Sequence, residues 1–344
     1  MTTSSETTRG GLPEGDAWRE LILGRAGNVA DGGSTWRSIF ARLKQLALAT
    51  TDPLTLHREL VVPDCLLAES AWDLWEQFRP AAPSAIDQLK QFWAAGSATG
   101  TAVLILDGLS LRELPLIVAA ATDRGIAPLR VEVRAAEVPT ETDQFASALG
   151  IAGRSKLFNN KAPAGFIFAG SDVYTDVLDS PFADCVASVP ASPRLFIWHK
   201  WPDEPLIHLH EDKQDGPAIV ADTTRKELSS DGFWSFVDRL RQGRRLAITS
   251  DHGYAVSKLF SSEVTDKEIV KLLRETFGAK RCAKVRPDRP WPRCHLPPLV
   301  CQYGDWLVVM GQRKWASPGG FPNLCHRGLS LLEAAVPWVE LPPL

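Results

Sequence analysis

The sequence predicts an α/β protein with a mostly parallel sheet, preceded by a helical N-terminal region. Three observations support this prediction. The apolar run Thr101–Leu106 (TAVLIL) has the length and composition of a buried parallel strand. Similar runs follow it and alternate with stretches of helical periodicity, an order typical of layered α/β folds. Before this run, residues 17–95 show helical periodicity and no clear strand.

The N-terminal region divides into a polar start and a helical part. Residues 1–15 are rich in Thr, Ser and Gly, so we expect disorder there and neither a signal peptide nor a membrane anchor. Over residues 16–96, apolar side chains recur with a helical period, as in the stretch Ser34–Ala47. Small residues mark the end of this region, and we expect one α/β domain over residues 97–344.

Further strands and helices follow along the α/β domain. We expect strands at Leu129–Arg134, Arg194–His199, Arg245–Ser250 and Trp306–Met310. We expect helices over Leu111–Arg124, from Phe145 onward and over Phe233–Arg241. The proline-rich stretch Arg286–Pro298 must be a loop or an extended segment.

The composition excludes several classes of protein. Of the 344 residues, 44% are hydrophobic and 23% are charged, which excludes a chain disordered throughout. The net charge of −3 argues against a general electrostatic attraction to nucleic acid. The longest apolar run is far shorter than the roughly 20 residues that cross a membrane, so we expect a cytoplasmic protein without a membrane partner. The six cysteines are scattered without a C-x-x-C pair, which predicts reduced, buried thiols.

Carboxylates and histidines follow three of the predicted strands. Asp107 follows the first strand, Asp203 follows RLFIWHKW, and Asp251 and His252 follow RLAITS. In an open parallel sheet, ligands bind beyond the carboxyl ends of the strands. Carboxylate oxygens combined with imidazole nitrogens suit Zn²⁺ or Mn²⁺. The pattern therefore predicts a cation site at this edge of the sheet.

Five segments resemble, in order, the PglZ domain of the alkaline phosphatase superfamily. They are ILDGLS, VPTET, WPDEPLIHLH, ITSDHGY and CHRGLSLLEAAVPWVEL. The last segment is the most specific, because its H-x-G-L-S-x-x-E-x-x-x-P run follows an S-D-H-G strand end. The resemblance covers roughly residues 97–344 and implies an alkaline-phosphatase-like three-layer αβα core with helices on both faces of the sheet.

The resemblance implies two bound divalent metal ions, usually zinc. It matches Asp107, Asp251 and His252 to the ligands of one ion.

For the second ion, the resemblance matches Asp203, His326 and a histidine near Asp203. The family spacing is Asp-x-x-x-His, whereas here His208 follows Asp203 by five positions and His210 by seven. We favour His208 and keep His210 open.

The resemblance also implies a hydroxyl nucleophile. In related phosphodiesterases it is the second threonine of a P-T-x-T run, so Thr142 is favoured and Thr140 is the alternative. Coordination to a dication lowers the pKa of a hydroxyl and lets it attack phosphorus. Asn160 and Lys161, a little further along, are weaker candidates for donors to a phosphoryl oxygen.

Together these features predict a metal-dependent phosphohydrolase that acts on a phosphate ester, with phosphodiesters of nucleotides or oligonucleotides as the favoured class. PglZ domains resemble components of bacterial anti-phage systems of the BREX type, which implies a role in defence. The alternative is an inactive scaffold or regulatory subunit of a defence complex. In both cases the N-terminal helices are candidate docking sites for protein partners.

Three other features have ordinary structural interpretations. We expect His57 at the surface and His199 packed in the core. The basic stretch Arg281–Arg293 around Trp291 is expected to be a solvated loop. Its functional alternative is a local grip on a phosphate backbone with one base stacked on the indole.

Overall fold

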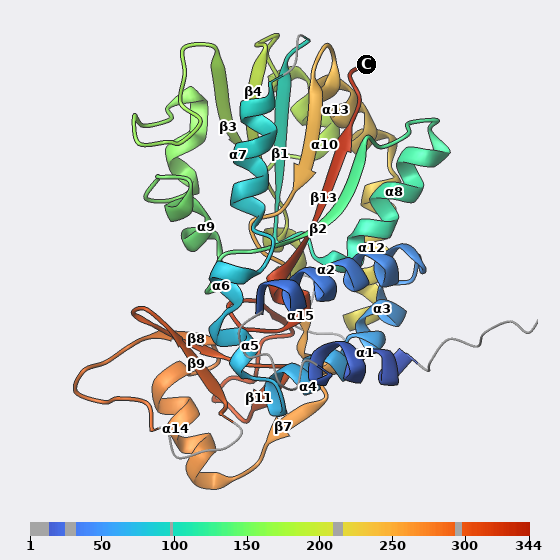
Figure 1. Cartoon of the computed structure of the whole chain (residues 1–344). Helices are drawn as coiled ribbons and strands as arrows, with labels where there is room; N and C mark the ends of the chain where they lie inside the picture. Colours follow the sequence, from blue (N-terminus) through green and yellow to red (C-terminus); the bar gives the residue numbers. More distant parts are fainter. Residues whose placement is uncertain (1–13, 25–31, 97–98, 209–215, 293–297) are drawn as a thin grey trace, which may run out of the picture.

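The computed structural model describes residues 14–24, 32–96, 99–208, 216–292 and 298–344, and gives no side-chain description for residues 14 and 206–208 (Figure 1). The predicted disordered segment, residues 1–15, lies almost wholly outside these ranges. Residue 14 already belongs to the first helix, α1 (Glu14–Leu23).

A six-stranded sheet forms the centre of the molecule (Figure 1). Its strand order is β2-β13-β5-β1-β4-β3. The strands are β1 (Thr101–Asp107), β2 (Arg130–Ala135), β3 (Val173–Leu178), β4 (Arg194–Pro202), β5 (Arg245–Thr249) and β13 (Ala335–Leu341). The pairings of β1, β3, β4 and β5 with one another are parallel, and β13 runs antiparallel between β2 and β5. The predicted α/β class with a mostly parallel sheet is confirmed.

Helices cover both faces of this sheet. The side chains of β1 point alternately to the two faces and so belong to two different apolar cores. Val103 and Ile105 pack under α7 (Ala85–Ala95) and α9 (Thr142–Ala148). Leu104 and Leu106 belong to the core of the opposite face. That face is covered by α8 (Leu114–Asp123), α10 (Phe182–Cys185) and α13 (Asp231–Arg241) (Figure 1). The three-layer arrangement agrees with the expected αβα core.

The helices before β1 pack on this same core. After α1 they are α2 (Gly32–Leu48), α3 (Pro53–Glu59), α4 (Val61–Glu69), α5 (Asp73–Glu76), α6 (Phe78–Ala81) and then α7. Trp36 lies at their centre, with ring centroids 5.0 Å from Trp75 and 4.8 Å from Phe78. These rings and the side chains of β1 and β5 form one continuous apolar cluster, so the N-terminal helices stabilise the sheet directly.

One buried carboxylate of α4 contacts the last part of the chain. Asp64 accepts hydrogen bonds from the backbone amide of Leu331 at 2.8 Å and from Nε2 of Gln312 at 2.7 Å. Burial raises the pKa of Asp64 to about 7.

A smaller group of strands lies beyond the carboxyl-terminal edge of the main sheet (Figure 1). It contains the antiparallel sheet β8-β10-β9, the pairs β7-β11 and β6-β12, and the helix α14 (Lys267–Phe277). The strands are β6 (Ala255–Val256), β7 (Ser262–Val264), β8 (Cys282–Lys284), β9 (Val300–Tyr303), β10 (Trp306–Val309), β11 (Arg313–Trp315) and β12 (Leu324–Cys325). The strand expected at Trp306–Met310 is therefore present, but it lies outside the main sheet.

Short elements complete the fold. They are the helices α11 (Asp203–His208), α12 (Gly216–Ser229) and α15 (Leu331–Ala334), and the 3₁₀ turns η1 (Leu111–Glu113), η2 (Arg154–Asn160), η3 (Val186–Ser188) and η4 (Ser257–Leu259). Within the described ranges, no helix has both the length and the apolarity to cross a membrane. The five described cysteines are free thiols, and four of them are buried.

Two histidines lie in the interior of the protein. The expectation that His57 lies at the surface is wrong: its side chain on α3 is fully buried between the N-terminal helices and η1. His199 is packed in the core as expected, with its ring stacked on Phe182 at 4.2 Å between centroids. Burial lowers the pKa of His57 to about 3 and that of His199 to about 4.

We predict that acid destabilises the fold partly through His57. In the unfolded chain a histidine titrates near pH 6.5, whereas burial holds the pKa of His57 near 3 in the folded protein. Below pH 6.5 the unfolded state binds a proton that the folded state does not, so stability is lost as the pH falls. Between pH 7 and pH 5 this loss is about 2 kcal/mol. Urea unfolding of His57→Gln at both pH values should show a smaller pH difference by about this amount.

The exposed neighbour Arg58 supplies the control for this measurement. Arg58→Gln should retain the full pH difference of the wild type. Equal pH differences in His57→Gln and the wild type would contradict the assignment to His57.

Candidate metal centre

The predicted edge of the sheet brings three buried donors together. Asp107 is the last residue of β1, and Asp251 and His252 follow the end of its parallel neighbour β5. One ligand atom from each of these side chains lies within 4.8 Å of the other two. All three side chains are buried. Two carboxylates and one imidazole at this separation form a donor set suited to Zn²⁺.

The hydroxyl of Thr142, at the start of α9, lies within this cluster. Its Oγ1 lies 2.9 Å from Oδ2 of Asp251, 3.3 Å from Oδ1 of Asp107 and 3.5 Å from Nε2 of His252. Thr142 as a whole residue is half-buried. The hydroxyl of Thr140, the alternative candidate, donates instead to the carbonyl of Gly328 at 3.0 Å. Of the two hydroxyls, that of Thr142 is the one beside Asp107, Asp251 and His252.

The carboxylate of Asp251 is held by the backbone that follows β1. Its Oδ1 accepts from the amide of Gly108 at 2.9 Å, which leaves Oδ2 directed at Thr142. Gly108 has a φ of 72°, in the left-handed region that favours glycine. A Cβ at this position would also lie only 3.1 Å from Cβ of Asp203. The Asp-Gly pair after β1 is therefore required by both the turn and the close packing.

The ring of His252 is oriented as a metal ligand. Its Nδ1 lies 3.0 Å from the carbonyl of Gly253, which can only accept, so Nδ1 carries the proton. Nε2 then faces the cluster, at 3.6 Å from both Oδ1 of Asp107 and Oδ2 of Asp251. A carbonyl partner on the remote nitrogen is the usual support of a metal-binding histidine.

Asp203 and His326 flank the same cluster. Oδ1 of Asp203 and Cε1 of His252 both lie 3.5 Å from the Cβ position of Gly108. Burial raises the pKa of Asp203, and the neighbouring Asp251 adds to this shift while His252 opposes it. The ring of His326 stacks on His252 at 4.5 Å between centroids, with an interplanar angle of 9°.

The ring of His326 is held neutral with one nitrogen available. Burial and the neighbouring His252 lower the pKa of His326 well below its usual value. Its Nδ1 donates to the carbonyl of Thr140 at 3.3 Å, which leaves Nε2 without the proton. A neutral imidazole with a free nitrogen is the form that binds a metal ion.

The side chains of the two remaining histidine candidates near Asp203 lie outside the described part of the structure. His208 belongs to α11, but its side chain lies outside the described part of the chain, and His210 lies outside it altogether. The choice between them stays a prediction.

Arg154 lies in the site and was not among the sequence-based candidates. Its guanidinium Nη1 forms an ion pair with Oδ2 of Asp107. It lies at the start of η2, shortly after α9, and its side chain is 23% exposed. An arginine following the helix that carries the threonine is a weak signal in sequence, because nothing local indicates that the chain turns back to β1.

The candidates Asn160 and Lys161 lie in the same segment as Arg154. Oδ1 of Asn160 accepts from the amide of Thr175, so this side chain ties the turn to β3. Lys161 is exposed, and the described residues include no hydrogen bond or ion pair between it and the cluster. Their proposed contact with phosphate remains untested.

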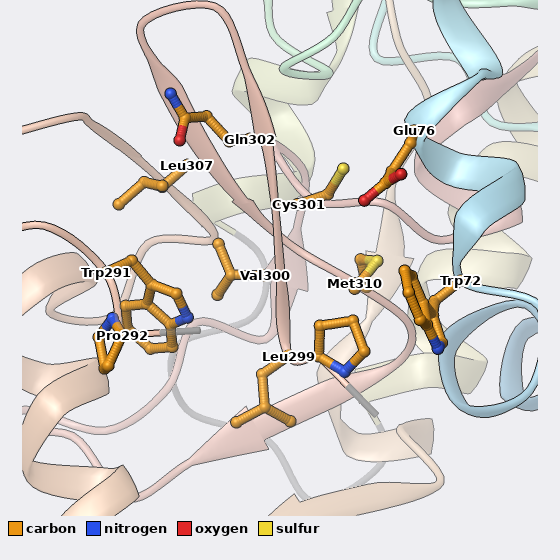
Figure 2. Close-up of a pocket in the computed structure, with 11 residues that line it drawn as sticks. Trp72, Glu76, Trp291, Pro292, Leu299, Val300, Cys301, Gln302, Leu307 and Met310 are labelled. Carbon is orange, nitrogen blue, oxygen red and sulfur yellow. The ribbon is translucent and has the colours of Figure 1, made fainter. Parts of the chain in front are cut away.

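The basic stretch around Trp291 lies on the smaller group of strands. Arg281 is buried and pairs with Glu333, and Arg289 lies 3.9 Å from Glu275. Trp291 lines a cavity of about 370 Å³, with Trp72 on its opposite wall (Figure 2). Lys284, Arg286 and Arg289 are exposed and line a small pocket together with Trp291, so the contact of this stretch with a phosphate backbone stays a prediction.

Comparison with known proteins gives a limited result. No protein-family model matches the chain, and no curated protein matches it. Among solved structures, murine ectonucleotide pyrophosphatase/phosphodiesterase 5 in complex with AMP is 11% identical, with a TM-score of 0.42 over 71% of this chain and 88% of that one. Phosphonoacetate hydrolase from Sinorhizobium meliloti in complex with phosphonoformate is 14% identical, with a TM-score of 0.42. That match covers 71% of this chain and 90% of the hydrolase chain. Similarity at this level supports no statement about activity.

We predict that the cluster binds Zn²⁺ through Asp251. In metal sites, replacing groups that only support the ligands lowers affinity about 10- to 100-fold, so Asp251→Asn should lower it by at least about 100-fold. Competition with a chromophoric chelator measures this affinity. The control Asp143→Asn changes an exposed carboxylate of α9 and should bind zinc as the wild type does. Equal affinities in all three proteins would rule out the assignment.

Proposed function

We propose that this protein is a metal-dependent phosphohydrolase of the alkaline phosphatase superfamily with Thr142 as the nucleophile. One observation carries the proposal: the hydroxyl of the half-buried Thr142 lies 2.9 Å from Asp251 and 3.3 Å from Asp107, among buried donors suited to a metal ion. Covalent catalysis by an alcohol needs this arrangement, because an isolated hydroxyl is a weak nucleophile at neutral pH. The resemblance of residues 97–344 to the PglZ domain supports the same assignment.

The side chains present fit two zinc ions. Asp107, Asp251 and His252 would hold the first ion. Asp203 and His326, together with His208 or His210, would hold the second. When bound, such ions lower the pKa of a coordinated hydroxyl and stabilise charge on phosphoryl oxygens.

Thr142 and Asp251 would carry out the reaction in two displacements at phosphorus. Oγ1 of Thr142 attacks phosphorus and its proton leaves toward Oδ2 of Asp251, the nearest acceptor. The bond from phosphorus to the leaving oxygen breaks, and the leaving group takes up this proton from Asp251 and departs as an alcohol. Water then attacks the phosphothreonine: its hydroxyl bonds to phosphorus, its other proton passes to Oγ1 of Thr142, and the phosphate product departs. Two displacements at phosphorus predict retention of configuration.

Arg154 is suited to binding the substrate phosphate in this scheme. Its guanidinium is part-exposed and lies beside Asp107 at the same edge as Thr142. Guanidinium groups bind phosphate oxygens through paired, charge-assisted hydrogen bonds. We propose phosphodiesters of nucleotides or oligonucleotides as the substrate class.

A second candidate function rests on the ion pair between Arg154 and Asp107. A guanidinium that neutralises Asp107 permanently would occupy one of the candidate ligands, which would suit an inactive scaffold. The PglZ resemblance supports a place in anti-phage defence for either function. Protein partners would then contact the N-terminal helices.

We predict that Thr142→Ala abolishes hydrolysis but retains zinc. Removing a covalent nucleophile should lower kcat by at least about a thousandfold. Thr142→Ser keeps a hydroxyl and should retain measurable turnover. Initial rates with bis-p-nitrophenyl phosphate and p-nitrophenyl phosphate, on protein of known zinc content, measure the effect and compare the diester with the monoester.

The variant Thr140→Ala separates the two threonines. It removes the hydrogen bond to Gly328 but not the hydroxyl in the cluster, so it should lower kcat far less than Thr142→Ala. Loss of turnover in Thr140→Ala with retention in Thr142→Ala would reverse the assignment. Zinc-loaded wild type that hydrolyses neither substrate would favour the scaffold.

A further inference from the structure

Three separate segments carry most of the candidate site, and one buried glutamate contacts two of them. The segments are residues 140–142, 251–253 and 326–328. The glutamate is Glu333 in α15, whose side chain is 0% exposed. It follows His326 in the chain but is not one of the donors in the cluster.

Each carboxylate oxygen of Glu333 accepts two hydrogen bonds. Oε1 accepts from the amide of Gly328 and from Nε of Arg281, each at 2.9 Å. Oε2 accepts from Oγ of Ser330 at 2.7 Å and from Nη2 of Arg281 at 2.9 Å. The main-chain carbonyl of Glu333 accepts from the amide of Gly253 at 2.9 Å. The same residue therefore holds the segment after His326 and the segment after His252.

The contact with Gly328 extends to the segment that carries Thr142. The carbonyl of Gly328 accepts from the hydroxyl of Thr140 at 3.0 Å. The carbonyl of Thr140 in turn accepts from the amide of Arg327 at 2.9 Å and from Nδ1 of His326 at 3.3 Å. A displacement of Gly328 would thus be transmitted to both His326 and Thr142.

The two glycines that Glu333 binds have no free space around them. A Cβ on Gly253 would lie 2.1 Å from the carbonyl oxygen of Leu332. A Cβ on Gly328 would lie 2.3 Å from Nε of Arg281. The backbone therefore approaches α15 and the guanidinium as closely as glycine permits.

The ion pair with Arg281 anchors Glu333 to the smaller group of strands. Nη1 of Arg281 donates to the carbonyl of Arg313 at 2.7 Å, and Nη2 donates to that of Gly311 at 2.6 Å. Both charges are buried and hydrogen-bonded. Such a pair adds little net stability over an apolar replacement, because desolvation offsets the attraction. Its consequence here is a fixed geometry for the backbone that it binds.

We propose that Glu333 is a positioning residue of the metal centre, which sets His326 relative to His252 and Thr142. This inference rests on the proposed function, because it presumes that these side chains act on a bound metal ion. Glu333 is not one of the candidate ligands and would act through Gly328 and Gly253.

The test compares Glu333→Gln with Glu340→Gln in the full chain. Glu340 in β13 is a matched control: it is also buried, accepts from Nε1 of Trp338 at 2.9 Å and lies 3.9 Å from Nε of Arg245. Zn²⁺ affinity is measured by chelator competition, and the visible spectrum of the Co²⁺-loaded protein reports ligand geometry. Glu333→Gln should bind zinc about tenfold or more weakly than the wild type, with an altered Co²⁺ spectrum. Glu340→Gln should match the wild type in both.

The outcomes separate this inference from the proposed function. Wild type that binds no zinc would overturn both. Wild type that binds zinc, with Glu333→Gln unchanged in affinity and spectrum, would overturn the positioning role alone. The positioning role would also be overturned if Glu340→Gln altered the zinc affinity and the Co²⁺ spectrum as much as Glu333→Gln does. If Glu333→Gln does not fold, Ser330→Ala removes one donor to Oε2 and should weaken zinc binding severalfold. Unchanged zinc affinity in Ser330→Ala would then overturn the inference.

Discussion

The parallel pairing of β1 with β5 is the constraint on which the candidate site depends. Ile105 lies opposite Thr249, so both strands end at the same edge and deliver Asp107 beside Asp251. β4 pairs with β1 on the other side and brings Asp203 to this edge. No local preference of these residues would place three carboxylates together. The hydrogen bonds of the sheet and its two apolar faces supply the free energy that does so.

Gathering carboxylates in a buried place has an electrostatic cost that the fold must offset. The amide of Gly108 offsets part of it at Asp251, and the guanidinium of Arg154 offsets part of it at Asp107. At Asp203 the pKa is raised by burial despite the nearby His252. A cation bound at this edge would offset the remaining repulsion between the carboxylates. The whole-chain charge of −3 therefore says little about the field at the strand ends.

Residues at strand ends could be predicted from sequence, whereas contacts across the fold could not. Asp107, Asp251 and His252 follow apolar runs whose strand character is local. Arg154 and Glu333 depend on partners 47 and 52 positions away in the chain, Asp107 and Arg281, and no periodicity indicates such pairs. β10 was predictable as a strand, but the sheet it joins depends on long-range packing. β3 was missed because this edge strand carries the polar Thr175 and the acidic Asp176, which interrupt its apolar pattern.

The hydrogen bond from the amide of Leu331 to Asp64 connects the N-terminal helix α4 directly to α15, near the C-terminal end of the chain. The first turn of α15 is capped by a side chain that lies 267 residues earlier in sequence. The helices before β1 therefore do not form an exchangeable module. A change in their sequence that moves α4 would alter the backbone near the site, so substitutions in the two regions are expected to be coupled over evolution.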